Sequence, residues 1–83
     1  DAAIESFQRA TTIGPADAIG HFNLARAYQM RFVKTSRYDP RMERWIGVEE
    51  DRRRAIASFE QYLKLGGPYE NQAREAIASL RWK

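Results

Sequence analysis

A short pattern that occurs twice decides the fold of this chain: residues 3–10 read AIESFQRA, and residues 55–62 read AIASFEQY. Both copies place alanine, isoleucine and phenylalanine at the same offsets, and a Gly-Pro pair follows each, at residues 14–15 and 67–68. An internal repeat indicates a chain built from stacked copies of one small unit, rather than a chain built around one catalytic centre.

Helical periodicity extends through most of the chain, with apolar residues three or four positions apart. The Gly-Pro pair at 14–15 and Gly66-Gly67-Pro68 predict helix ends, Asp17 predicts a helix start, and a last helix is predicted from about Glu70 to Trp82. No segment shows the alternation of a strand, so we predict an all-α fold of about four main helices. The residues expected to face the core are Ile4, Phe7, Ala10 and Ile13 in the first helix, His21, Leu24, Ala25 and Tyr28 in the second, Ile56, Phe59 and Leu63 in the third, and Ala73, Ile77 and Leu80 in the fourth.

The second predicted helix carries a more specific pattern, because Leu24, the small residue Ala25 and Tyr28 follow one another at intervals of one and three. This order resembles the tetratricopeptide repeat family, whose unit of about 34 residues follows W-x2-L-G-x2-Y, then A-x3-F, then P. His21 stands in the place of the tryptophan and Ala25 in the place of the glycine. The resemblance implies a solenoid of antiparallel helix pairs.

The spacing of the two copies predicts an insertion. Ala3 and Ala55 are 52 positions apart, against a family period of about 34, so about 18 residues are inserted after Tyr28. We therefore predict a single domain over residues 1–83. It comprises the second helix of a repeat (1–15), one repeat (16–66) interrupted at about 31–51, and a closing helix (68–83). A chain that opens in mid-repeat predicts a segment of a longer protein.

Charge and aromatic residues concentrate around this insertion. Between Arg31 and Arg54 there are eight positive and five negative residues, an excess equal to the net charge of +3 of the whole chain. The segment also contains large apolar residues: Phe32, Tyr38, Met42, Trp45 and Ile46. Asp39-Pro40 as a start and Gly47 as an end predict a short helix over residues 40–46, so we expect the insertion to form a loop or this short helix.

Two interpretations of the insertion remain open. Tyr38, Trp45 and Ile46 could fold back over the core, with the arginines as a solvated face. Alternatively, the insertion is a docking surface for a partner, because Trp, Tyr and Arg dominate interface hot spots. The candidate residues of that surface are Tyr38, Arg41, Arg44 and Trp45.

The resemblance also implies a concave face that holds extended peptides or partner helices. The residues it places there are Ile19, Phe22, Asn23, Arg26, Gln29 and Met30. In some members of the family, an asparagine at the position of Asn23 hydrogen-bonds the backbone or carboxylate of the bound peptide, and Arg26 could grip a carboxylate. Gln72 and Ala76 stand where the following helix should supply a cationic pair, so the carboxylate clamp is incomplete. The alternative for Asn23 and Arg26 is packing between helices or simple solvation.

Catalytic and metal-binding patterns are absent from the sequence. There is no cysteine, the single His21 has no acidic or imidazole partner at i+4, and no serine has a histidine and an acid near it. Glu49-Glu50-Asp51 is typical of a helix start, and no phosphate-binding glycine loop occurs. We predict no enzymatic activity, no cofactor and no metal site.

The sequence thus predicts a protein-interaction module that scaffolds or docks onto a multi-subunit complex, with another protein or a peptide as its partner. One alternative is a basic segment, residues 31–54, that binds nucleic acid or an anionic membrane, although five acids dilute its field. Another is a structural spacer within a longer solenoid. No apolar run approaches the roughly 20 residues that a membrane-spanning helix needs.

Overall fold

A computed structural model describes residues 2–14 and 16–82 of the chain. Over these residues it has four helices, α1 (Ala2–Ile13), α2 (Ala18–Thr35), α3 (Glu49–Leu65) and α4 (Glu70–Trp82), and two short strands, β1 (Arg37–Asp39) and β2 (Arg44–Ile46). The mostly helical fold with four main helices is confirmed. Asp1 and Lys83, at the ends of the predicted domain, and Pro15, in the first predicted helix stop, lie outside the described residues.

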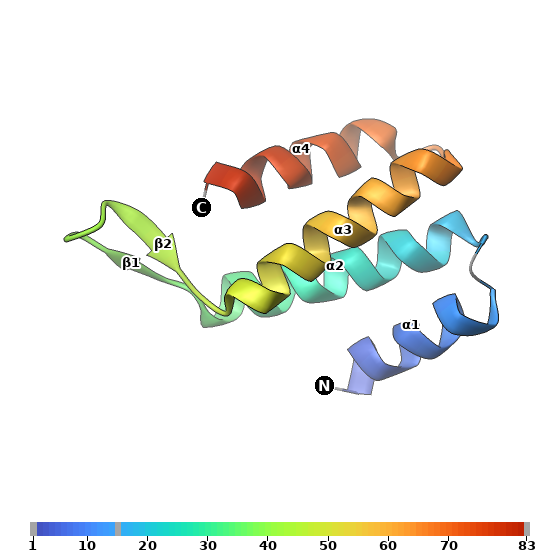
Figure 1. Cartoon of the computed structure of the whole chain (residues 1–83), viewed down its shortest axis with the longest axis horizontal. Coiled ribbons are helices and arrows are strands. Elements are labelled where there is room, and N and C mark those ends of the chain that lie inside the picture. The colour runs from blue at the N-terminus through green and yellow to red at the C-terminus, as the bar shows by residue number, and fades with distance from the viewer. Residues whose placement is uncertain (1, 15, 83) are drawn as a thin grey trace.

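Successive helices run antiparallel and form a single row (Figure 1). α2 packs along α3, α1 packs on the outer side of α2, and α4 packs on α3. The row is flat, with principal extents of 42 × 27 × 14 Å. No described helix is both long and apolar enough to cross a membrane.

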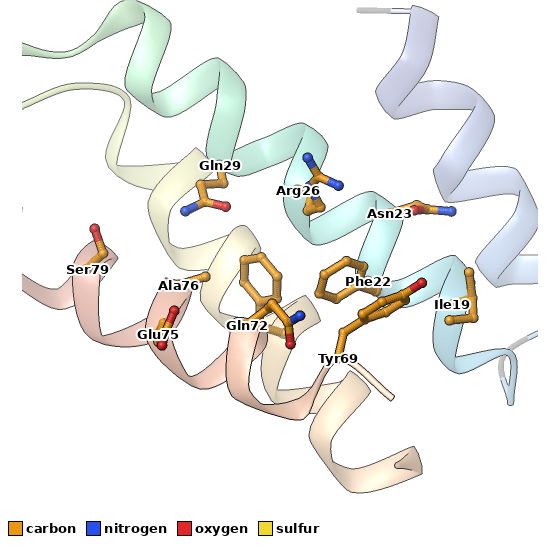
Figure 2. Close-up of a pocket in the computed structure, with 11 residues that line it drawn as sticks. Ile19, Phe22, Asn23, Arg26, Gln29, Tyr69, Gln72, Glu75, Ala76 and Ser79 are labelled. Atoms are coloured by element: carbon orange, nitrogen blue, oxygen red, sulfur yellow. The ribbon is translucent and has the colours of Figure 1, made fainter. Parts of the chain in front are cut away.

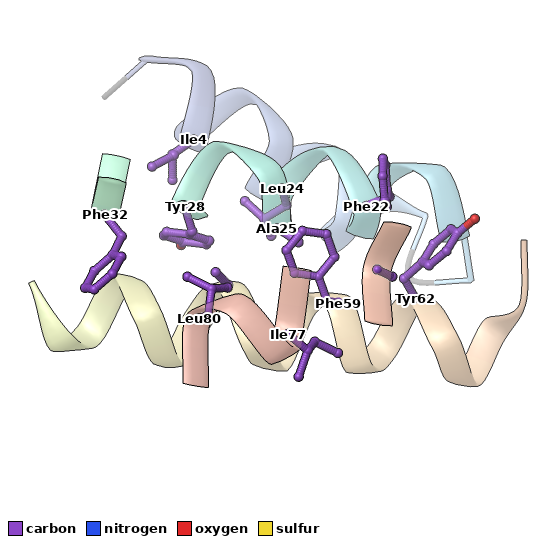
Figure 3. Packing of buried hydrophobic residues seen from close by; sticks show 12 residues of the cluster. Ile4, Phe22, Leu24, Ala25, Tyr28, Phe32, Phe59, Tyr62, Ile77 and Leu80 are labelled. Carbon is purple, nitrogen blue, oxygen red and sulfur yellow. The ribbon is translucent and has the colours of Figure 1, made fainter. Parts of the chain in front are cut away.

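One apolar core runs through the row and draws on all four helices (Figure 3). It confirms the inward orientation predicted for Leu24, Ala25 and Tyr28 in α2, for Phe59 in α3, and for the apolar residues of α4. The buried apolar residues are Ile4, Phe22, Leu24, Ala25, Tyr28, Phe32, Ala55, Phe59, Tyr62, Ala73, Ile77 and Leu80.

Some predicted core positions are less buried than their periodicity suggested. In α1 only Ile4 is buried, whereas Ala10 is exposed and Ile13 is 86% exposed. Because α1 lies at the edge of the row and packs mainly on α2, its apolar stripe is only partly covered. His21 in α2 is half-buried rather than buried.

The short helix predicted over residues 40–46 is wrong, because this segment belongs to a β-hairpin. β1 and β2 pair antiparallel, with Tyr38 opposite Trp45. The backbone N–H of Arg41 donates to Oδ1 of Asp39 at 2.9 Å, which closes a turn at Asp39-Pro40. Asp-Pro begins turns as readily as helices, and the cross-strand aromatic pair favours the strands.

The insertion also lengthens the two central helices. Residues 31–35 belong to α2 and residues 49–51 belong to α3, so residues 36–48 alone lie between the helices. The hairpin therefore sits at the end of the α2–α3 pair and extends beyond the row of helices (Figure 1).

Buried contacts hold the base of the hairpin against the helices. A Cβ on Gly47 would lie 2.9 Å from the ring of Phe32, so the chain approaches this buried ring at a distance that only glycine allows. Arg52 lies over the same ring, 5.4 Å from its centroid, and donates a hydrogen bond of 3.4 Å to the carbonyl of Leu80. Phe32 of α2 thus contacts both the base of the hairpin and Arg52 of α3, and Arg52 links α3 to α4.

Candidate functional site

A groove between α2 and α4 is the candidate functional site (Figure 2). Its volume is about 900 Å³, and α3 contributes Phe59 to its floor. The other lining residues are Ile19, Phe22, Asn23, Arg26 and Gln29 from α2, Tyr69 from the loop before α4, and Gln72, Glu75, Ala76 and Ser79 from α4.

Aromatic rings form the apolar part of the groove. Phe22 contacts three rings: Phe59 edge-on at 5.7 Å, Tyr62 at 5.0 Å, and Tyr69 stacked at 5.0 Å between centroids. The buried hydroxyl of Tyr62 accepts the backbone N–H of Tyr69 at 2.7 Å, which fixes the loop that carries Tyr69. Tyr69 remains 42% exposed, so its ring offers a surface on which an apolar ligand group can pack.

Polar side chains on both walls of the groove have no partner among the described residues. Three carboxamides, Asn23 and Gln29 on α2 and Gln72 on α4, and the hydroxyl of Ser79 make no hydrogen bond with the rest of the described chain. A carboxamide both donates and accepts, so these groups match the N–H and C=O groups of an extended peptide backbone.

The two walls also carry opposite charges. Arg26 lies on α2 and Glu75 lies on α4, and neither has an ion-pair partner within the described residues. Both side chains are exposed, and Figure 2 shows them on the two sides of the groove. The arrangement is suited to binding a ligand. In the described parts of the chain, no three acidic or histidine side chains gather as metal ligands.

Most residues predicted for the concave face do lie together in this groove. Ile19, Phe22, Asn23, Arg26 and Gln29 line one wall. Met30 does not line this groove: it is 66% exposed and borders a second groove, of about 660 Å³, between α1 and α2, which Asn23 and Arg26 also border.

Gln72 and Ala76 on the opposite wall were expected from the sequence, whereas three other residues of that wall were not. Glu75 and Ser79 could have been found, because they lie three and seven positions after Gln72 on one helical face. Tyr69 carried no such signal, since it belongs to a loop whose path depends on the contact with Tyr62.

The predicted insertion residues form a separate surface on the hairpin. Tyr38 is 51% exposed and Trp45 is 43% exposed, so the interpretation that they fold back over the core is wrong. Their rings pack edge-on against each other at 5.8 Å, whereas Ile46 is half-buried. Arg41 and Arg44 are exposed, and Arg44 lies 3.8 Å from Glu49. No hairpin residue lines the groove.

Comparisons with protein-family models, with curated proteins and with solved structures gave no match for this chain.

Proposed function

We propose that this chain is a tetratricopeptide-like interaction module that binds an extended peptide segment of another protein in the groove between α2 and α4. The observation that carries the proposal is the set of unpartnered carboxamides on both walls of an aromatic-floored groove. Such groups satisfy a peptide backbone in any sequence, while the aromatic floor selects apolar side chains.

The order of the helices supports the proposal. The groove-lining helices α2 and α4 alternate with α1 and α3, as the resemblance to the repeat family implies. Two walls of one groove then come from equivalent helices of successive units.

The charges favour an internal peptide segment over a free carboxyl terminus. Gripping a terminal carboxylate requires several cations, but Arg26 faces Glu75 across the groove, and Gln72 and Ala76 are uncharged. A suitable segment carries an acidic side chain that reaches Arg26 and a basic one that reaches Glu75. The exposed hairpin offers this module a second docking surface within a complex.

Ion pairs within the chain argue against the alternative that the basic segment, residues 31–54, binds nucleic acid or an anionic membrane. Four of the eight cations between residues 31 and 54 are engaged with acids of the same chain: Arg31, Arg44, Arg52 and Arg54. Their fields are therefore partly neutralised at the positions where phosphates would have to approach.

The proposal is tested by selecting peptides from a random library on the 83-residue chain and measuring their affinities by fluorescence polarisation. Asn23→Ala and Gln72→Ala should each weaken the selected peptides by about five- to tenfold, the value of one hydrogen bond. Asn71→Ala is the matched control, because Asn71 is exposed on α4 but does not line the groove.

Peptides that bind equally to the wild-type chain and to both groove variants would contradict the proposal, as would a selection that yields none. A pool that consists of carboxyl-terminal binders only would overturn the preference for an internal segment.

A further inference from the structure

The β-hairpin has two backbone edges beside which no further strand of the described chain lies (Figure 1). An unpaired edge is a template for another strand, and a two-stranded sheet by itself is marginally stable. The register places Tyr38 opposite Trp45 on one face, and Asp39 opposite Arg44 and Arg37 opposite Ile46 on the other. The hairpin is thus an exposed sheet with one aromatic face and one charged face.

The edge of β1 is complementary to itself. β1 reads Arg37-Tyr38-Asp39. If two copies pair antiparallel about a two-fold axis through Tyr38, each Arg37 lies opposite Asp39 of the other copy, and the tyrosines lie opposite each other. Opposite charges placed directly across antiparallel strands stabilise the pairing.

The edge of β2 lacks this property. β2 reads Arg44-Trp45-Ile46, so the same operation would place arginine opposite isoleucine and form no ion pair. Charge complementarity therefore distinguishes the two edges and selects β1.

We propose that a second copy of this chain pairs along β1, forming a four-stranded sheet in the order β2-β1-β1-β2. One face of this sheet would carry the row Trp45, Tyr38, Tyr38, Trp45, which covers side chains that are half exposed in the single chain. On the other face each Asp39 would lie between Arg44 of its own copy and Arg37 of the other. Arg37 has no acidic partner among the described residues of its own chain, so this pairing is available to it.

The shape of the molecule permits this pairing. The hairpin extends beyond the helices, so antiparallel pairing places the two helical rows at opposite ends of the sheet (Figure 1). The turn of each copy, with Met42 57% exposed, then approaches the base of the other hairpin, where Val48 is 47% exposed. Both peptide grooves stay open, so the dimer can bind two segments of one partner at once.

This inference names a partner for the hairpin surface and rests on the proposed function only for the use of the two grooves. Association is expected to be weak, since strands of three residues form an interface well below the roughly 1,200 Å² of stable complexes.

The test follows the amide resonances of residues 37–39 and the sedimentation of the 83-residue chain up to about 1 mM, where an interface of this size becomes populated. Arg37→Asp should abolish the concentration dependence, because it places carboxylates opposite each other twice. It leaves the hairpin itself intact, since residue 37 faces Ile46 within the chain. Lys64→Asp makes the same change of charge on an exposed position of α3, away from the hairpin, and should have no effect.

The decisive test mixes two charge variants of β1. Asp39→Arg alone should also fail to self-associate, because it places arginines opposite each other twice. An equimolar mixture of the Arg37→Asp and Asp39→Arg chains should associate, because both ion pairs form, one with its original sign and one with its sign reversed. The Tyr38–Trp45 ring contact, read from their proton shifts, checks that each hairpin is formed.

A wild-type chain that remains monomeric at about 1 mM, single variants that associate like the wild type, or a mixture that does not associate would each overturn the pairing. A monomeric chain whose hairpin resonances shift with anionic vesicles or single-stranded DNA would assign the hairpin to that ligand instead. Groove-binding peptides are measured in the same samples, and their affinity should not change with the β1 variants. Failure of self-pairing is thereby distinguished from failure of the proposed function.

Discussion

At the scale of single residues, the ion pair between Arg31 of α2 and Asp51 of α3 joins the two central helices near the hairpin. Nε and NH2 of Arg31 donate to the two carboxylate oxygens of Asp51 at 2.9 and 2.6 Å. This hydrogen bonding raises the pKa of Arg31 above its ordinary value. The environments of the partners differ, because the side chain of Arg31 is 36% exposed and that of Asp51 is 3% exposed.

Because the two side chains differ in burial, we predict that replacing Arg31 and replacing Asp51 lower the free energy of unfolding by different amounts. Arg31→Met should lower the free energy of unfolding by about 3 kcal/mol, because it leaves a buried carboxylate unpaired. Asp51→Asn should cost about 1 kcal/mol, because the half-exposed guanidinium can turn to water. Urea unfolding followed by circular dichroism measures both values.

The double variant Arg31→Met with Asp51→Asn is the control, and it should cost less than the sum of the single changes. Equal costs for the two single variants would mean that Asp51 reaches water or another donor when Arg31 is removed.

At the scale of the element, the hairpin turn contains a strained residue. Glu43 has φ of +52°, in the left-handed region that residues with a Cβ enter at a cost of about 1 kcal/mol. Asp39 closes the other side of the turn through its hydrogen bond to Arg41. The hairpin is therefore held by one favourable turn contact and weakened by one unfavourable backbone conformation.

We predict that Glu43→Gly stabilises the hairpin, because glycine enters the left-handed region without this penalty. The protection of the hairpin amides against hydrogen exchange should rise by about threefold to fivefold, with the unfolding of the helices unchanged. Glu43→Ala removes the same charge but keeps the strained conformation, and it should not increase protection. Equal gains from both variants would assign the effect to charge instead.

At the scale of the whole molecule, the apolar core of the described chain is formed by the helices alone. The large hairpin side chains of Tyr38 and Trp45 are about half exposed to solvent. The base of the hairpin, in contrast, is packed through Gly47 against the fully buried Phe32. The helical row and the projecting hairpin are thus expected to be largely independent in stability.

Replacing residues 37–46 by a short Gly-Ser loop, with Gly47 retained, should change the free energy of unfolding by less than about 1 kcal/mol, because the replaced residues lie outside the core. Thermal and urea unfolding by far-ultraviolet circular dichroism measure this. A loss of about 3 kcal/mol or more would instead mean that the hairpin stabilises the helical row.

The helices and most of the core could be predicted from the sequence, because helix periodicity and helix ends depend on residues close together in the chain. α4 begins and ends at the predicted residues, Glu70 and Trp82, and Leu24, Ala25 and Tyr28 are buried as expected. One wall of the candidate groove was expected from the resemblance to the repeat family, which places residues 19, 22, 23, 26 and 29 on a concave face.

Tertiary structure decided the features that depend on contacts between distant residues. Asp39-Pro40 is compatible with a helix start and with a turn, and the pairing of Tyr38 with Trp45 selects the turn. The contact of Tyr69 with Tyr62 places an aromatic ring in the groove, and Asp51 pairs with Arg31 twenty positions earlier in the chain. Local patterns specify which face of a helix or strand is apolar. Which other element packs against that face depends on how all the elements fit together in the folded chain.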